Sequence, residues 1–227
     1  LNMIDKKSWK VILDMAKAGD PTAMVEAGDY FADGYEDTTE GIIVKQDEKK
    51  AFKMYYNAAA LMDTEGISRM ALCLSEGIGC KQDIEGAIVV YKQALEMGDS
   101  IAAYNLGTIY RDQGKYKKAF KHYKVAMQLD HADYSFKVGL CYYYGIGTDV
   151  NKEKALKHFK KVAKDKNKFH TPYEIDESNL YLGFIYLEGE VAKRSLKKAK
   201  KYFERANEVN EHETAREMLL LLGELDG

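Results

Sequence analysis

A pattern of small and aromatic residues repeats along most of the chain. One phrase has the form Ala-x₃-Tyr/Phe-x₂-small, and its five copies are separated by 36, 32, 36 and 44 residues. The copies begin at Ala51, Ala87, Ala119, Ala155 and Ala199. Before each copy stands a second phrase, in which a hydrophobic and a small residue precede an aromatic or aliphatic one: Ala27–Phe31, Met70–Leu74, Leu106–Tyr110, Val138–Tyr142 and Leu182–Tyr186. Paired helical phrases at this period predict a stack of helical hairpins.

Turn and capping signals stand between the two phrases. Glycines at 77 and 79, and again at 145 and 147, supply the backbone conformations of a tight turn. Four residues before the alanine stands a residue able to cap a helix: Asp47, Asp83, Asn151 or Ser195. Gly19-Asp20-Pro21 reads as a stop, a cap and a first helical position. These signals predict where each second helix begins.

The repeats predict one continuous array, a single repeat domain over residues 1–227. Five hairpins are expected at about 21–63, 64–98, 99–131, 132–168 and 176–210, with a half-repeat at each end and a capping helix at 212–224. Extra residues within Tyr35–Lys45 and around Lys166–Ser178 are expected to form loops. Trp9, in the opening half-repeat, is expected to seal the N-terminal end of the core.

These motifs together resemble the Sel-one-like repeat family, a relative of the tetratricopeptide repeat. The resemblance rests on Leu/Val-Gly-x₂-Tyr, the Gly-x-Gly turns, the capping Asp and Ala-x₃-Tyr/Phe-x₂-Ala, while the third repeat is similar to an ordinary tetratricopeptide unit. It implies an all-α fold, a right-handed α-α superhelix of about five helix-turn-helix repeats that binds proteins or peptides. It brings no catalytic residues to carry over, so no enzyme activity is expected.

In such a superhelix the first helix of each hairpin lines the concave side. A stripe beside the core positions begins polar and acidic in repeats one and two, then becomes aromatic. Tyr and Arg are the types most enriched among binding hot spots. For repeats three to five we predict a peptide-binding groove formed by Tyr104, Thr108, Arg111, Phe136, Leu140, Tyr143, Tyr144, Leu180, Phe184 and Leu187. About half of the stripe is expected to pack against the next repeat, with Tyr143, Tyr144 and Arg111 accessible.

Charge argues against bulk affinity for nucleic acid or anionic membranes. The formal net charge is −2, and the lysine runs at 152–168 and 193–201 have the spacing of exposed helix faces. The halves differ, because residues 1–113 carry a net −7 and residues 114–227 a net +5. The acidic half would suit a basic partner. A solvated surface remains the simpler interpretation.

No pattern of catalytic or metal-binding residues stands out. His-x₃-His, Cys-x₂-Cys and Gly-x-Ser-x-Gly are absent from the sequence, so no metal or cofactor is expected. Cys73 and Cys141 hold one register two repeats apart, beyond disulfide reach, and Cys80 falls in a turn. Reduced thiols, no apolar run of 18 residues and no signal sequence predict a cytoplasmic protein.

The sequence therefore favours a non-catalytic protein–protein interaction module that acts as an adaptor or regulator. The alternative is a bacterial immunity-type protein that blocks a toxin, and an enzyme with an unrecognised site is a distant third. A homodimer through the C-terminal helix is also expected, because the leucines at 219–222 cannot all face one side.

Overall fold

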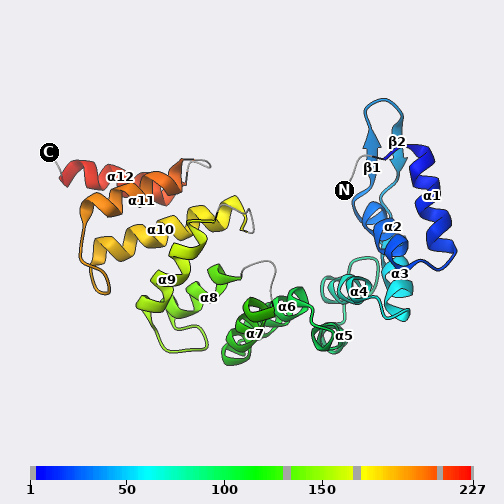
Figure 1. Ribbon diagram of the computed structural model, residues 1–227, viewed down its shortest axis with the longest axis horizontal. Coiled ribbons are helices and arrows are strands. Elements are labelled where there is room, and N and C mark those ends of the chain that lie inside the picture. The colour runs from blue at the N-terminus through cyan, green and yellow to red at the C-terminus, as the bar shows by residue number, and fades with distance from the viewer. Residues whose placement is uncertain (1–3, 130–133, 166–169, 209–211, 226–227) are drawn as a thin grey trace. The chain divides into compact units, whose positions relative to one another are not determined.

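The computed structural model describes residues 4–129, 134–165, 170–208 and 212–225 (Figure 1). In these residues it shows twelve helices and one two-stranded antiparallel sheet. The elements are α1 (Lys6–Lys17), α2 (Pro21–Asp33), β1 (Tyr35–Asp37), β2 (Gly41–Val44), α3 (Glu48–Ala60), α4 (Thr64–Glu76), α5 (Ile84–Glu96), α6 (Ser100–Asp112), α7 (Tyr116–Leu129), α8 (Ser135–Tyr144), α9 (Lys152–Val162), α10 (Pro172–Glu188), α11 (Leu196–Asn207) and α12 (Glu213–Leu225). The expected all-α repeat fold is confirmed.

The chain divides into two compact units, residues 1–109 and 110–227. In unit 1, α2 packs on α3 and α4 packs on α5. In unit 2, α8 packs on α9, α10 on α11, and α12 on α11. The last turn of α6 belongs to unit 2. The single domain expected from the sequence stays a prediction.

Helix starts follow the predicted caps. The side chains of Asp47, Asp83, Asn151 and Ser195 each accept a hydrogen bond from the backbone N–H three residues on. Asp20 caps α2, with Pro21 in the first helical position. Each cap satisfies a backbone donor that the helix itself leaves unpaired.

Small residues mark the helix contacts. The alanines that begin the five second-helix phrases are all fully buried. A Cβ added to Gly183 would collide with the ring of Phe203, and one added to Gly28 would collide with the ring of Tyr55. Paired helices therefore approach closest where the side chain is smallest, and the aromatic ring fills the space beside it.

The expected loop at 35–45 is instead a β-hairpin, β1–β2, which Figure 1 shows beside α1 and α2. The Asp37 carboxylate closes the turn by accepting hydrogen bonds from the backbone N–H groups of Thr39 and Glu40. The β-branched run at 42–44 then pairs back, because such residues favour extended backbone. Trp9 packs edge-on against Tyr30 with the ring centroids 5.7 Å apart and lies against the core of the first repeat, while its sealing role stays a prediction.

The second expected loop, around 166–178, is also wrong over much of its length. Residues 166–169 lie outside the described chain, but α10 already begins at Pro172. Thr171 and Glu174 form a reciprocal capping box at this helix start. The extra length of repeat five therefore lengthens its first helix to 17 residues.

The three thiols are free, as expected from their spacing. Burial raises the pKa of all three thiols, to about 11 at Cys73 and at Cys141, and Cys80 is only partly buried. Since the thiolate is the nucleophile, at pH 8 about one molecule in a thousand carries it at either buried site. We expect a thiol reagent to modify Cys80 first, with Cys73 and Cys141 reacting only on unfolding. Mass spectrometry of the partly labelled protein checks the order, and equal labelling of all three would contradict it.

The leucines of α12 divide between core and surface. Leu222 is buried against α11, and Leu219 is partly buried beside it. Leu220 and Leu221 are 64% and 53% exposed. The homodimer through this helix stays a prediction. Among the helices that the structure describes, none has the length and apolarity to cross a bilayer.

Candidate functional site

In the predicted groove stripe, the side chain at the end of each first helix is more exposed than the one near its start. The position two before the core hydrophobic residue is buried in four repeats, at Val25, Ser68, Phe136 and Leu180. The last position is exposed in all five, at Asp33, Glu76, Asp112, Tyr144 and Glu188. Phe136 and Leu180, 2% and 6% exposed, are therefore core residues that a partner cannot reach. In these four repeats the first position of the stripe is therefore covered, and in all five its last position is open.

The polar stripe of unit 1 is paired internally. Asp29 accepts a hydrogen bond from the Tyr55 hydroxyl at 2.7 Å and forms an ion pair with Arg69 at 3.3 Å. The hydroxyl of buried Ser68 donates to Asp99. These groups hold adjacent repeats together, so they are less available to a partner than the sequence pattern indicated.

The predicted groove residues of the third repeat are divided between the two units. Tyr104 and Thr108 are half-buried in unit 1. In unit 2, exposed Arg111 binds Asp112 at 2.8 Å and lines a hollow together with Tyr116 and Ile146. A binding role for these predicted residues stays a prediction.

Three tyrosines of repeats four and five meet on unit 2, and we call them the tyrosine cluster: Tyr143, Tyr144 and Tyr181. The Tyr181 ring lies 5.0 Å from that of Tyr143 and 6.0 Å from that of Tyr144, both edge to face. The hydroxyls of Tyr144 and Tyr181 lie 3.0 Å apart, within hydrogen-bond distance. Tyr144 is 56% exposed, whereas Tyr143 is half-buried. Edge-to-face pairs of this kind favour one relative orientation of the rings. Tyr144 therefore exposes its ring to solvent while it packs against the other two tyrosines.

Phe159 of α9 supports the tyrosine cluster from the core. Its ring is fully buried and stacks on that of Tyr181 with the centroids 4.9 Å apart. The half-buried side chains of Leu140, Phe184 and Leu187 lie on the same two first helices. Phe184 packs edge-on against Phe203 at 5.4 Å. The partly or fully accessible predicted residues of repeats four and five thus lie on α8 and α10.

One ammonium and two carboxylates lie beside the tyrosine cluster, a net charge of −1. Lys152 bonds to Glu188 at 2.7 Å and to Glu190 at 2.8 Å, and its ammonium lies 5.6 Å from the Tyr143 ring centroid. These carboxylate hydrogen bonds raise the pKa of Lys152 above its ordinary value. Burial, with the Glu188 charge as a smaller cause, raises the pKa of Tyr143 to about 12. At neutral pH the cluster therefore offers neutral rings and hydroxyls.

Tyr181 is a site residue that sequence reasoning missed. It stands directly before the core residue Leu182, one position outside the stripe that was counted. In repeat two the same position holds Arg69, which reaches back to Asp29 of repeat one. The residue before the core hydrophobic residue thus contacts the preceding repeat in both cases. That shared register was the available signal.

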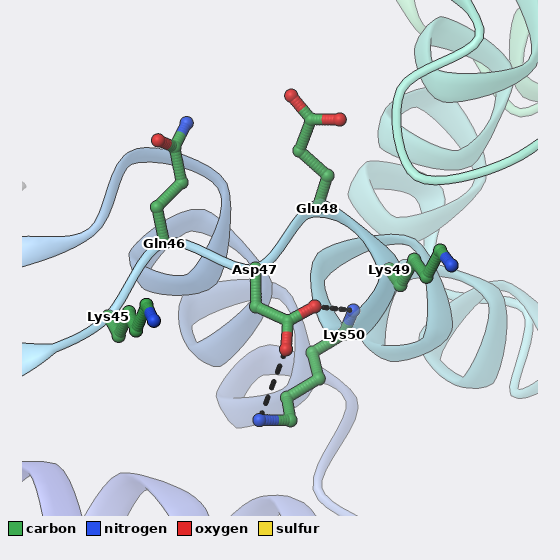
Figure 2. A pocket seen from close by; sticks show the side chains of 6 residues that line it. All are labelled: Lys45, Gln46, Asp47, Glu48, Lys49 and Lys50. Atoms are coloured by element: carbon green, nitrogen blue, oxygen red, sulfur yellow. Dashed lines mark hydrogen bonds and ion pairs between the residues drawn. The ribbon is translucent and has the colours of Figure 1, made fainter.

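Another hollow lies at the start of α3 (Figure 2). It is lined by six consecutive residues, Lys45 to Lys50. Figure 2 shows the Asp47 carboxylate turned toward Lys50, whose backbone N–H and ammonium it binds, while Glu48 points away. One short segment supplies the whole lining and the capping bond already occupies Asp47, so this hollow has no converging functional groups. Among the described residues, no three His, Cys, Asp or Glu side chains gather as metal ligands would.

Comparison with known proteins agrees with this architecture. The Sel1 repeat profile matches residues 22–61, 64–99, 132–167 and 176–209, which together exceed half of the chain. The chain belongs to the Sel1 repeat family. Residues 100–133 match the tetratricopeptide repeat, so the distinct character of the third repeat is confirmed. Proteins of this kind are typically protein-binding scaffolds.

Solved structures share the Sel1 repeat fold of this chain. A protective antigen of uropathogenic Escherichia coli with an SLR fold matches 99% of the chain with a TM-score of 0.75 at 19% identity. The chain spans 49% of the length of that protein. A Sel1 repeat protein from Oxalobacter formigenes matches 93% of the chain and 86% of its own length (TM-score 0.70, 21% identity). An immunity protein from Pseudomonas aeruginosa matches 91% of the chain and 75% of its own length (TM-score 0.53, 16% identity).

Proposed function

We propose that this Sel1 repeat protein is a non-catalytic adaptor whose tyrosine cluster binds a peptide segment of a protein partner. The observation that carries the proposal is Tyr144, which is exposed yet held by the rings of Tyr143 and Tyr181. A rigid aromatic side chain loses little conformational freedom on binding and is typical of hot spots. The neutral rings and hydroxyls of the cluster favour a segment with apolar anchors over a strongly charged one.

Replacement of exposed Tyr144 together with the half-buried Phe184 of α10 tests the proposal. Peptides are selected from a displayed random library on the immobilised protein, and their Kd is measured by fluorescence anisotropy. We expect enrichment of peptides with aromatic or aliphatic anchors. The double variant Tyr144→Ala, Phe184→Ala should lose about 2 kcal/mol of binding free energy or more, because truncated hot spots cost that much.

Tyr56→Ala is the matched control, since Tyr56 is also 56% exposed but lies on α3 in unit 1. It should bind the selected peptides as the unmodified protein does. Peptides that bind the double variant with unchanged affinity, or a selection without apolar anchors, would refute a role for the tyrosine cluster.

Inhibition of a toxin is the second candidate. It is favoured by the shared fold of the Pseudomonas aeruginosa immunity protein and by the net −7 of residues 1–113. An inhibitor should capture one folded partner and depend on exposed acidic residues such as Asp33 and Glu76. The variant Asp33→Asn, Glu76→Gln would then release that partner, whereas the Tyr144→Ala, Phe184→Ala variant would retain it.

A further inference from the structure

The second helices of unit 2 form a strongly basic layer. Within their bounds, α7, α9 and α11 carry 14 Lys and Arg residues against two Glu. Thirteen of the 14 are Lys. In contrast, α10 of the first-helix layer carries four acidic residues and no basic ones. Positive charge in unit 2 is therefore concentrated on one set of helices.

A repeated arrangement of side chains, which we call the cation ladder, organises this layer. In each repeat of unit 2 the lysine before the core alanine lies over the tyrosine that ends the first-helix phrase. Lys118 lies 5.4 Å from the Tyr110 centroid, Lys154 lies 5.0 Å from that of Tyr142, and Lys198 lies 5.0 Å from that of Tyr186. Cation–π contacts of this kind favour one position of a long side chain over its other rotamers.

A second ring supports each tyrosine of the cation ladder. His122 stacks on Tyr110 at 5.3 Å, His158 on Tyr142 at 5.8 Å, and Tyr202 on Tyr186 at 5.5 Å. All three supporting rings stand three residues after the core alanine. Each repeat thus presents the same unit, an exposed ammonium seated on a stacked pair of rings. Near the last of these units, Lys160 lies 5.6 Å from the Tyr186 centroid and Arg205 lies 5.7 Å from that of Tyr202.

In unit 1 the equivalent lysine forms an ion pair with a nearby carboxylate. Lys50 lies over Phe31 in the equivalent place, but the helix cap Asp47 forms an ion pair with it at 3.1 Å. In unit 2 the residue three before the ladder lysine is Lys115, Asn151 or Ser195, none of them acidic. Within the described ranges, no carboxylate lies within ion-pair distance of Lys118, Lys154 or Lys198. As far as the described residues go, the ladder therefore holds three ring-seated cations that have no carboxylate partner in the chain.

We propose that the cation ladder binds an acidic segment of a protein partner, whose carboxylates pair with the seated lysines repeat by repeat. The site lies on other side chains than the tyrosine cluster and does not depend on it. A nucleic acid fits the observations less well. The ladder tyrosines are already covered by lysine and by a supporting ring, which leaves little open face for base stacking. Arginine forks suited to phosphate are also scarce in this layer.

Matched triple variants of the full chain test the cation ladder. The probe is a fluorescein-labelled oligoglutamate peptide long enough to span three repeats, measured by anisotropy at about 50 mM salt. The ladder variant is Lys118→Gln, Lys154→Gln, Lys198→Gln. The control variant is Lys121→Gln, Lys157→Gln, Lys201→Gln, which removes the same charge from exposed positions three residues further along the same helices. In the part of the chain that the structure describes, these control lysines lie over no ring.

We expect the unmodified protein to bind the peptide in a salt-sensitive manner. The ladder variant should bind at least about tenfold more weakly and the control variant less than about threefold, because only the ladder lysines are held in place. Replacement of the ladder lysines by arginine should retain binding, since the cations and their ring contacts remain. The Tyr144→Ala, Phe184→Ala variant should bind the acidic peptide unchanged, which separates this inference from the proposed function.

Three outcomes would overturn the inference. The first is no binding of the acidic peptide at low salt. The second is an equal loss in the ladder and control variants, which would show bulk charge alone. The third is tighter binding of a labelled single-stranded oligonucleotide than of the peptide. Unfolding temperatures of all variants, measured in parallel, show whether each one is folded when it is tested.

Discussion

Replacement of Gly147 by alanine is expected to lower the free energy of unfolding by about 3 kcal/mol or more. Gly147 has φ +70°, a left-handed conformation that costs other residues about 1–2 kcal/mol. Its missing side chain also lies directly against the backbone carbonyl of Tyr116, where α7 begins. An added Cβ would collide with that carbonyl, and backbone cannot move aside as a flexible side chain can. The two costs should therefore add.

Gly114→Ala is the control that separates strain from collision. Gly114 has φ +71°, and an added Cβ there would meet nothing within 4 Å. It should cost only the conformational term of about 1–2 kcal/mol. Urea unfolding followed by circular dichroism measures both variants, and the slope of the transition shows whether it remains cooperative. Equal losses at Gly147 and Gly114 would contradict a role for the contact with Tyr116.

This contact gives the second glycine of the Gly-x-Gly turn its physical reason. Gly79 meets the carbonyl of Glu48 at the start of α3 in the same manner as Gly147 meets Tyr116. Both glycines therefore sit where the turn of one repeat presses on the second helix of the preceding repeat. The sequence showed a turn at these places, but it could not show that a neighbouring repeat lies against the turn.

Repeat five, which lacks the second glycine, joins its neighbour differently. The equivalent position is Val191, and the ion pairs of Lys152 with Glu188 and Glu190 connect the turn to the start of α9. In repeat one the turn is replaced by the β1–β2 hairpin. Departures from the repeat pattern thus mark places where the contact between hairpins changes, although the pattern alone does not say what replaces it.

The fold was predictable because each hairpin is encoded within about 36 residues of sequence. Caps such as Asp83 and contact alanines such as Ala87 act on neighbours a few residues away, so their spacing carries the information. The hairpin at 35–44 was missed because strands of three and four residues leave too short a period to recognise. The early start of α10 was missed because Thr171, Pro172 and Glu174 lie outside the repeated phrase.

The candidate site was less predictable because it depends on how one repeat meets the next. The stripe on the first helices stays a prediction as a binding surface, and its burial depends on the stagger between neighbouring helices. That stagger buries Phe136 and Leu180 and leaves Tyr144 open. It also brings Tyr181 back to Tyr143, a contact across 38 residues of sequence. The register that Tyr181 shares with Arg69 indicates such a contact only when the stacking of the repeats is known.

Replacement of Phe159 by alanine is expected to cost about 3–5 kcal/mol of unfolding free energy. Its ring is fully buried and fills the space between α8, α9 and α10. Its ring centroid lies 6.2 Å from that of Phe136, 6.1 Å from that of Tyr143 and 4.9 Å from that of Tyr181. The backbone of α8 also comes close to the ring, because a Cβ added to Gly139 would lie 2.9 Å from it. The surrounding helices therefore cannot collapse far into the cavity, and a poorly filled cavity adds to the lost burial.

Phe120→Ala provides the matched control for this cavity. Phe120 is only half-buried and makes one edge-to-face contact, with Tyr142 at 5.3 Å. Its removal should cost about 1–2 kcal/mol, since solvent or neighbouring side chains can refill the space. Urea unfolding of both variants gives the comparison.

The Phe159→Ala variant should also bind the peptides selected on the tyrosine cluster more weakly, at temperatures where it remains folded, because Tyr181 loses the ring on which it stacks. A Phe159→Ala cost no greater than that of Phe120→Ala would show that the ring is not the centre of this core. Unchanged peptide binding by folded Phe159→Ala protein would show that the tyrosine cluster keeps its geometry without the Phe159 ring.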